Sequence, residues 1–436
     1  MRDKFKKHKY HKNNSNNAMD EFIMQPKCDP NSLKSKNLKL FSNKVFEFIK
    51  YHNSKSKNHN NENITKVFSS ARLIVITNNK FNKYSAIDYV FGFNNIYILQ
   101  YENPEKAAFA YTKYLENPDI IYVEPDRVIK LINSKLLIPP KLTLHNYTSY
   151  HSWGFEYLNT EKAFDYILQN KTTDDLPQLV VGVIDDGIDA DNQVFKDRIL
   201  ATHSFVGDSA TSIISDMGHG TNVSSILIEN TLENVKIISY KIFSERETTL
   251  SILRLAEIQA ELDGVDFVNS SYGMLYEFES NIKKPLHIAS AGNFKNDLPQ
   301  YPAACKNVIS VTGINNKGVL SDISTYGDWV SVAAPSENIK LPGLYNLDKY
   351  MEFNGTSCAV PFVTATCAMI KTQCPDLSNK QIKQVLFDSC IKTDIPIQYG
   401  IVNMYNAVTY FDDNIKPIDK LPVSAHENKE KETVMV

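Results

Sequence analysis

The chain has 436 residues, of which 22% are charged and 42% hydrophobic, and its formal net charge is -3. This length and composition are typical of a globular protein with more than one domain, and the near-neutral charge argues against nucleic acid as a partner. No apolar run approaches the ~18 residues that a membrane-spanning helix needs, so we expect no integral membrane segment.

The six cysteines are scattered without the spacing of metal ligands, so zinc is not expected and most of them are interpreted as free, buried thiols. The N-terminus is basic, but the apolar stretch of a secretory signal does not follow it. We therefore expect a cytoplasmic protein, with secretion by a non-standard route as the alternative.

Residues 1–68 are rich in Lys, Asn, His and Ser, and such a basic extension buries too little apolar surface to fold by itself. Within it, residues 38–51 have apolar side chains at helical spacing and predict one short helix. We expect this helix to be solvated, with contact to a membrane surface as the alternative.

Residues 69–132 differ in composition and predict a small α+β domain. Four short apolar runs predict strands, at 73–76, 96–100, 120–123 and 128–131. A helix is predicted at 104–115, because Pro104 opens an Ala-rich segment. Residues 133–150 contain Pro139-Pro140 and predict a linker.

From residue 151 to residue 410, short apolar runs alternate with helical patterns such as 249–262. The runs predict strands at 179–184, 235–242, 266–270, 287–290, 308–312 and 330–334. This alternation is typical of an α/β fold with a mostly parallel sheet covered by helices. Residues 411–436 are charged, contain two prolines and predict a disordered tail.

Four polar residues of this domain follow strands or open helices. Asp185 follows the first predicted strand and Asn293 follows the strand at 287–290. His219 stands between two glycines ahead of an apolar helix, and Ser357 precedes a run, 359–370, that predicts a buried helix. Taken singly, each is better explained as a turn, capping or surface residue.

Taken together, the four residues suit nucleophilic catalysis. A serine hydroxyl is a weak nucleophile until a base takes its proton, and histidine is the natural base near neutral pH. A carboxylate can orient that histidine, and an amide side chain can donate a hydrogen bond to a developing oxyanion. Parallel strands gather such groups at the edge of the sheet where the strands end.

The order of these residues and their neighbours resemble the subtilisin-like serine proteases. The matching segments are Val-Ile-Asp-Asp-Gly, Gly-His-Gly-Thr, Ser-Ala-Gly-Asn and Asn-Gly-Thr-Ser, within about 153–408. The resemblance implies a three-layer α/β domain in which Asp185 is the orienting acid, His219 the base and Ser357 the nucleophile. It also implies that Asn293 and the Ser357 N–H are the oxyanion donors.

The same resemblance implies where a peptide or protein substrate binds. Ser271-Tyr272-Gly273 matches the segment that pairs with the substrate backbone. Ser290-Ala291-Gly292 matches the opposite wall of the first specificity pocket. Gln300 matches the pocket floor, where glycine is common in the family, and this predicts a polar or restricted first subsite.

Residues 69–132 resemble the ferredoxin-like inhibitory prodomain of the family. The segment Tyr122-Val123-Glu124-Pro125-Asp126 is similar to the C-terminal signature of that prodomain. The resemblance implies a zymogen whose own prodomain is its inhibitor. The maturation cleavage is then expected after about Leu131 or within 133–150.

Several residues depart from the usual family pattern without removing a catalytic group, so we expect an active enzyme. They are Asn222, Ser224, Ser225, Cys358 and Phe362. Val194 stands where many members have a calcium-binding aspartate, and the loop that would complete that site is missing ahead of Val235. We therefore expect no metal at this position and no other cofactor.

The sequence thus predicts a serine endopeptidase that works through an acyl-enzyme. Two biological roles stay open: a dedicated processing peptidase, such as the leader peptidase of a modified-peptide pathway, and general protein turnover. A catalytically silent binding module is the alternative outside the enzymes, and the complete set of four residues argues against it.

Overall fold

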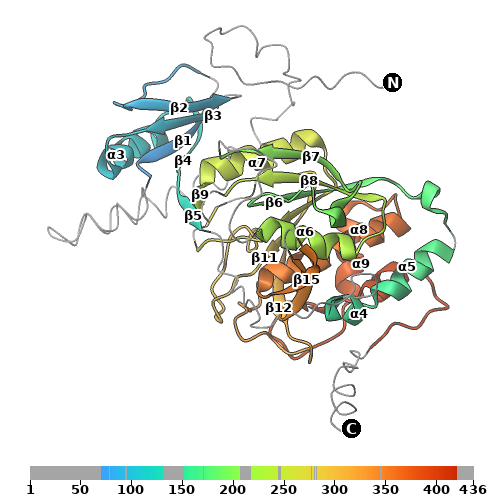
Figure 1. Ribbon diagram of the computed structural model, residues 1–436. Coiled ribbons are helices and arrows are strands. Elements are labelled where there is room, and N and C mark those ends of the chain that lie inside the picture. Colours follow the sequence, from blue (N-terminus) through green and yellow to red (C-terminus); the bar gives the residue numbers. More distant parts are fainter. Residues whose placement is uncertain are drawn as a thin grey trace, which may run out of the picture. The chain divides into compact units, whose positions relative to one another are not determined.

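The computed structural model describes residues 70–77, 79–93, 96–130, 152–169, 171–206, 218–243, 247–275, 277–278, 280, 282–343 and 346–419. These residues form two compact units, Met1–Pro125 and Asp126–Val436 (Figure 1). The expected basic extension with its helix at 38–51, the linker at 133–150 and most of the tail lie outside the described residues.

The first unit is a four-stranded antiparallel sheet with one described helix. The strands are β1 (Arg72–Thr77), β2 (Asp88–Phe93), β3 (Ile96–Gln100) and β4 (Ile120–Pro125), and the helix is α3 (Pro104–Leu115). The sheet order is β2-β3-β1-β4, and the pairing is antiparallel throughout. The expected α+β class and the helix bounds are confirmed, whereas β2 was not predicted.

The described residues between β1 and β2 form turns and not the second helix that a ferredoxin-like unit would have there. Tyr84 and Ser85 have φ of 46° and 64°. Two successive residues in the left-handed region cannot continue a right-handed helix. The segment therefore folds back as a turn, and Tyr84 packs its ring against Tyr114 of α3.

The second unit is built on an eight-stranded sheet in which every described pairing is parallel. Its order is β16-β13-β12-β11-β10-β6-β8-β7. The strands are β6 (Leu179–Asp185), β7 (Ile199–Ser204), β8 (Val235–Lys241), β10 (Phe267–Ser270), β11 (Leu286–Ser290), β12 (Val308–Ile314), β13 (Val332–Pro335) and β16 (Gly400–Ile401).

Helices cover both faces of this sheet and complete the three layers (Figure 1). Helix α7 (Leu250–Asp263) lies on one face, and α6 (His219–Glu229) and α8 (Thr356–Gln373) lie on the other. The remaining described elements are α4 (Trp153–Tyr157), α5 (Thr160–Gln169), α9 (Asn379–Asp388), α10 (Met404–Val408), η2 (Thr173–Asp175), η3 (Gln193–Phe195), β5 (Val128–Lys130), β9 (Glu247–Thr249), β14 (Ile339–Gly343) and β15 (Asn346–Phe353).

All six strands expected in this unit are confirmed within two residues at their starts, because buried parallel strands are continuous apolar runs. The edge strand β7 and the hairpin of β14 and β15 were not predicted. The residues of β7 are mostly half-buried, so the strand lacks the apolar run of the central strands. Strand β5 was predicted, but it pairs with β9 and not with the first sheet.

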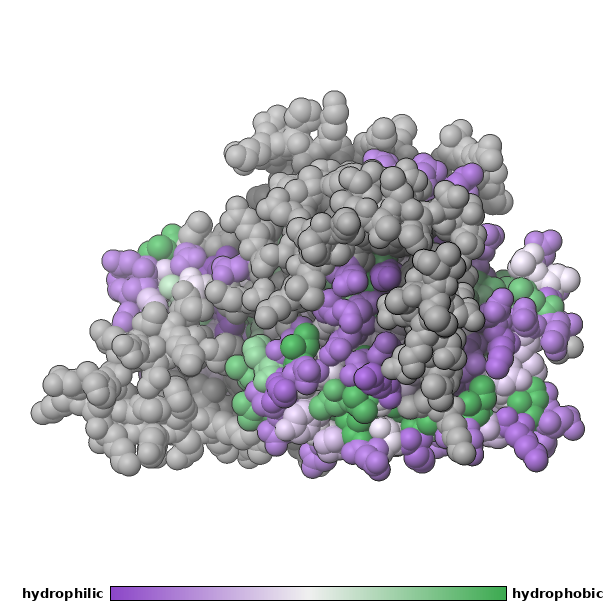
Figure 2. All heavy atoms as spheres, turned by 60° about the horizontal axis from the view of Figure 1, so that its bottom comes forward, coloured by the Kyte–Doolittle hydropathy of each residue, from purple (hydrophilic) through white to green (hydrophobic). Residues whose placement is uncertain are grey.

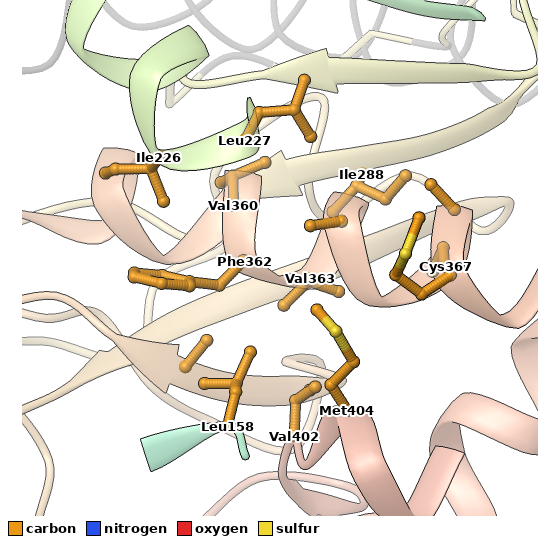
Figure 3. Close-up of a cluster of buried hydrophobic side chains, with 14 of the residues drawn as sticks. Leu158, Ile226, Leu227, Ile288, Val360, Phe362, Val363, Cys367, Val402 and Met404 are labelled. Atoms are coloured by element: carbon orange, nitrogen blue, oxygen red, sulfur yellow. The ribbon is translucent and has the colours of Figure 1, made fainter. Parts of the chain in front are cut away.

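Helix α8 fills the centre of the core and packs against α6. Figure 3 shows Val360 and Phe362 of α8 beside Ile226 and Leu227 of α6, and all four are fully buried. The helix starts at Thr356, three residues earlier than the apolar run predicted, with Gly355 as its N-cap at a φ of 120°. The reading of Ser357 as a plain N-cap residue is therefore wrong, since Ser357 is the second residue of the helix.

The outer surface is mixed in polarity. Figure 2 shows a face on which hydrophobic side chains lie scattered among hydrophilic ones. Exposed large apolar residues include Leu168, Leu200 and Leu262. No helix in the part of the chain that the structure describes combines the length and the apolar character needed to cross a membrane.

A buried chain of polar side chains connects α7 to the central strands. Glu257 of α7 accepts hydrogen bonds from Arg254 Nη1 (3.0 Å) and from Ser280 Oγ (3.1 Å). His287 of β11 lies between Ser280 Oγ, 3.1 Å from its Nδ1, and Ser270 Oγ, 2.9 Å from its Nε2. Burial lowers the pKa of His287 to about 3, because the charged imidazolium would lose its hydration.

Acid should destabilise the fold through His287. The unfolded chain takes up a proton near the ordinary pKa of 6.5, whereas the folded chain does so only near about 3. The free energy of unfolding therefore falls by up to about 1.4 kcal/mol per pH unit below 6.5 and is unaffected above it. When the pH falls from 6.5 to 4.5, we expect the free energy of unfolding of His287→Gln to decrease by about 2 kcal/mol less than that of its parent.

Urea unfolding at each pH measures this difference. Both chains should carry Ser357→Ala, so that the expected nucleophile takes no part. Identical pH dependence in parent and variant would contradict the burial of a neutral His287.

Candidate active site

The two groups expected to form the acid–base pair are in contact. Asp185 is the last residue of β6 and His219 is the first residue of α6. His219 Nδ1 lies 2.7 Å from Asp185 Oδ1, and both side chains are buried. A carboxylate only accepts, so Nδ1 carries the proton and Nε2 is left as the basic nitrogen. The Phe353 ring of β15 packs edge-on against the imidazole, with centroids 5.4 Å apart.

The first turn of α6 is pressed against the loop that follows β6. Asp186 accepts hydrogen bonds from the backbone N–H of His219 (3.0 Å) and of Gly220 (2.6 Å). A Cβ at Gly220 would lie 2.2 Å from the carbonyl oxygen of Gly187, so only glycine fits. The glycine after the histidine therefore has a packing reason: it lets the helix approach Asp185.

Ser357 is held at the start of α8 by two reciprocal bonds with Ser271. Ser357 Oγ donates to the carbonyl oxygen of Ser271 (3.1 Å), and Ser271 Oγ donates to the carbonyl oxygen of Ser357 (3.1 Å). Pro361 lies four residues after Ser357 inside the helix and has no N–H for that carbonyl. The Ser271 hydroxyl thus replaces the helical hydrogen bond that Pro361 removes.

The side chain of Asn293 is oriented by Thr356. Asn293 Oδ1 accepts from the backbone N–H (2.8 Å) and from the hydroxyl (2.9 Å) of Thr356. The amide nitrogen Nδ2 is buried and has no hydrogen-bond partner among the described residues. A Cβ at Gly355 would lie 2.8 Å from it. A buried donor next to Ser357 without an acceptor is costly unless a ligand oxygen binds to it.

The expected walls of the first specificity pocket are also joined. Ser290, at the end of β11, donates through Oγ to the carbonyl oxygen of Tyr272 (3.3 Å). Gln300 is fully buried, and its Cγ lies 2.9 Å from the position of a Cβ on Gly292. The Oε1 atom of Gln300 is buried without a described partner. Gln300 therefore fills space beside Gly292 with a polar side chain.

Residues 126–130, at the start of the second unit, pair with β9 and contact the first turn of α7. Strand β5 pairs antiparallel with β9, with Val128 opposite Thr249. The Asp126 carboxylate accepts from the N–H (2.8 Å) and the hydroxyl (2.9 Å) of Ser251 in the first turn of α7. The carbonyl of Arg127 accepts from Leu250 N–H (2.8 Å). This segment therefore caps α7 and adds a strand to the edge β9.

The described residues include no group of three or more His, Cys, Asp and Glu side chains suited to a metal ion. Cys358, beside Ser357, is fully buried, and burial raises the pKa of its thiol well above the ordinary value. The thiol therefore stays protonated near neutral pH, and a protonated thiol is a poor nucleophile.

Every site residue predicted from sequence lies in the second unit. All of them except Gln300 lie at or just after the carboxyl ends of β6, β10 and β11, or at the start of α6 and α8. Gln300 lies against Gly292. The contacts of Thr356, Phe353 and Asp186 were not foreseen, and neither was the edge strand β9. The Gly-Thr-Ser run was a usable signal for Thr356. A three-residue strand such as β9 gives no periodicity to detect.

Comparison with known proteins gives a consistent result. The chain is 26% identical over 314 residues to the thermophilic serine proteinase of Bacillus sp. (strain AK1), covering 65% of this chain and 76% of that protein. It is 28% identical over 249 residues to the intracellular serine protease of Paenibacillus polymyxa, covering 50% of this chain and 74% of that protein.

A structural match to fervidolysin from Fervidobacterium pennivorans, described as a keratinolytic enzyme related to subtilisin, has a TM-score of 0.61 at 19% identity. It covers 78% of this chain and 61% of that one, and it supports the fold alone. Residues 177–414, more than half of the chain, match the family described as the Subtilase family. The chain therefore belongs to the subtilase family of subtilisin-like serine proteases.

Proposed function

We propose that the chain is made as a zymogen and hydrolyses peptide bonds through Asp185, His219 and Ser357. The observation that carries this proposal is the 2.7 Å bond between Asp185 and His219. A histidine so oriented presents Nε2 as a general base. The helices that begin at His219 and close to Ser357 pack on each other, which supports a shared site for the two residues.

In the proposed reaction the Ser357 hydroxyl turns from the Ser271 carbonyl towards His219. Nε2 takes the hydroxyl proton while Oγ attacks the scissile carbonyl, and the imidazolium that forms is stabilised by Asp185. The same proton then passes to the leaving amine, and an acyl-enzyme remains on Ser357. Water, deprotonated by His219, releases the acyl group and restores the enzyme.

Two donors would bind the oxyanion. Asn293 Nδ2 is one, because Thr356 holds the other end of the amide. The Ser357 N–H is the second, since the first four N–H groups of a helix have no partner within it. Both are fixed before the substrate arrives, so no reorganisation is needed when the charge develops.

The docked segment 126–130 supports the zymogen part of the proposal. β5 pairs antiparallel with β9, and adding a strand to a β edge is how many proteins bind extended peptides. The segment is continuous with β4 of the first unit, so the first unit would be the chain's own inhibitor. Maturation then requires cleavage beyond β5.

A dedicated processing peptidase is the second candidate role, and Gln300 is the observation that favours it. A buried polar side chain against Gly292 leaves less room for a large apolar substrate side chain than glycine would. General protein turnover calls for a wide first subsite. A silent binding module would be supported if a fluorophosphonate probe failed to label Ser357.

The first test is Ser357→Ala. We expect no peptide hydrolysis and a chain that stays at full length, because self-cleavage needs the nucleophile. Mass spectrometry of the wild-type and variant chains, expressed in a host lacking proteases, reads both outcomes. Normal N-terminal processing of the variant would contradict the self-cleavage part of the proposal.

Asn293→Ala tests the oxyanion donor. We expect kcat to fall by about 10²–10³-fold with little change in KM, as for the corresponding donor in subtilisin. The donor acts on the transition state and not on the bound substrate. Ser378→Ala, at the cap of α9, is a remote control. A rate within a few-fold of the wild type would leave Asn293 as a structural residue only.

Gln300→Gly tests the first subsite and separates the two roles. The wild-type enzyme should cut a diverse peptide library after small or polar residues, and the variant should also cut after large apolar ones. We expect kcat/KM for a large apolar residue to rise by about 10-fold or more, since a methylene or two of extra room is worth ~1–3 kcal/mol. Mass spectrometry of the cuts decides; an unchanged preference would show that Gln300 does not border this subsite.

A further inference from the structure

Asp186 is a buried carboxylate that contacts the first turn of α6 and has no part in the reaction described above. It follows Asp185 in the chain, and its side chain is buried. Its two oxygens accept from the backbone N–H groups of His219 (3.0 Å) and Gly220 (2.6 Å). Its own N–H donates to Asp185 Oδ1 (2.8 Å), the oxygen that also accepts from His219.

Helix α6 needs a capping group from elsewhere in the fold. Its N-cap residue is Gly218, in the left-handed region at a φ of 52°, and glycine has no side chain to accept the N–H groups of the first turn. Asp186 supplies both acceptors from a position 33 residues earlier in the chain. Asp189 N–H adds a third link, to the Thr221 hydroxyl (2.9 Å).

The charge of Asp186 matters as well as its shape. The N-terminus of a helix carries a partial positive charge, which disfavours a cation placed there. His219 is the first residue of α6 and has to become an imidazolium during the reaction. A carboxylate bonded to the first two N–H groups offsets that positive end at the point where the new cation forms.

We propose that Asp186 is a positioning residue for His219: it fixes the backbone of the base against Asp185 and cancels the unfavourable end of the helix dipole. This inference rests on the proposed role of His219 as the base. It assigns to the second aspartate of the Asp-Asp-Gly run a task distinct from that of the first. A positioning role of this kind acts on the chemical step and leaves substrate binding unchanged.

The test compares Asp186→Asn and Asp186→Ala with the wild type. Asparagine keeps the shape but has one acceptor for two N–H groups and no charge, and alanine has neither. Labelling of Ser357 by a fluorophosphonate probe gives kinact and KI separately. All full-length chains are first incubated with a trace of tagged wild-type enzyme, later removed, so that their processing state is the same.

We expect kinact to fall by about 10-fold in Asp186→Asn and about 100-fold in Asp186→Ala, with KI within about threefold of the wild type. The matched control is Ser378→Ala, which removes the side-chain cap of α9. It should lower the thermal midpoint by a few degrees and leave kinact unchanged, which separates loss of a cap from loss of positioning.

A kinact within twofold of the wild type in both Asp186 variants would overturn the inference while labelling of the wild type upheld the proposed function. Equal loss in kinact for Ser378→Ala would reduce Asp186 to a contribution to stability, as would failure of both Asp186 variants to fold. If the wild-type chain is not labelled at Ser357, the proposed function fails and this inference fails with it.

Discussion

The hydrogen bond between Asp185 Oδ1 and His219 Nδ1 joins the end of a central strand to the start of a helix, and the rest of the site depends on it. The bond requires α6 to approach the loop after β6 more closely than a side chain at Gly220 would allow. It also requires α6 to be seated firmly on the sheet. Ile226 and Leu227 help to fix the position of α6 by packing on α8, the helix that carries Ser357 near its start (Figure 3).

Ser357 is held in place by hydrogen bonds to backbone groups, one of which has no helical donor because of Pro361. Pro361 deprives the Ser357 carbonyl of its helical donor, and Ser271 supplies the replacement from the end of β10. Thr356, one residue before the serine, orients Asn293 from the end of β11. The beginning of α8 is thus bonded to two neighbouring strands, and its fully buried apolar body leaves it no freedom to shift.

Much of this arrangement could be predicted from the sequence, because buried parallel strands are apolar runs and the polar residues that end them stand out. Asp185 and Asn293 were located in this way, and Ser357 was located by the apolar helix behind it. The capping of α6 by Asp186 could not be predicted, since it joins residues 33 positions apart through backbone N–H groups. The hydrogen bonds of Thr356 depend likewise on tertiary contact.

The local sequence pattern also failed to predict the turn between β1 and β2 and the pairing of β5 with β9. Tyr84 and Ser85 adopt the left-handed conformation although neither is glycine, so no glycine marked the position of the turn. The apolar residues of β5 predicted a strand but not its partner. A strand's partner is set by which unpaired edge lies within reach, and β9 offers one in the second unit.

Helix α7 links the docked segment to the wall of the site. Its first turn receives the Asp126 carboxylate and the Arg127 carbonyl. Its middle carries Arg254 and Glu257, which lead through Ser280 and His287 to Ser270, the residue before Ser271.

Any extended peptide could offer a backbone carbonyl to Leu250 N–H in place of that of Arg127, since every residue has a carbonyl group. The Asp126 carboxylate is different, because only a segment with a capping side chain at this position can bond to the first turn of α7 as well as pair with β9, and a carboxylate adds a favourable charge there. Under the proposed zymogen, the precursor segment would therefore be held by its cap on α7 as well as by its backbone pairing with β9. In that zymogen, a substrate without a capping side chain at this position would lack the bond to α7, and the chain's own segment would then compete with it until maturation.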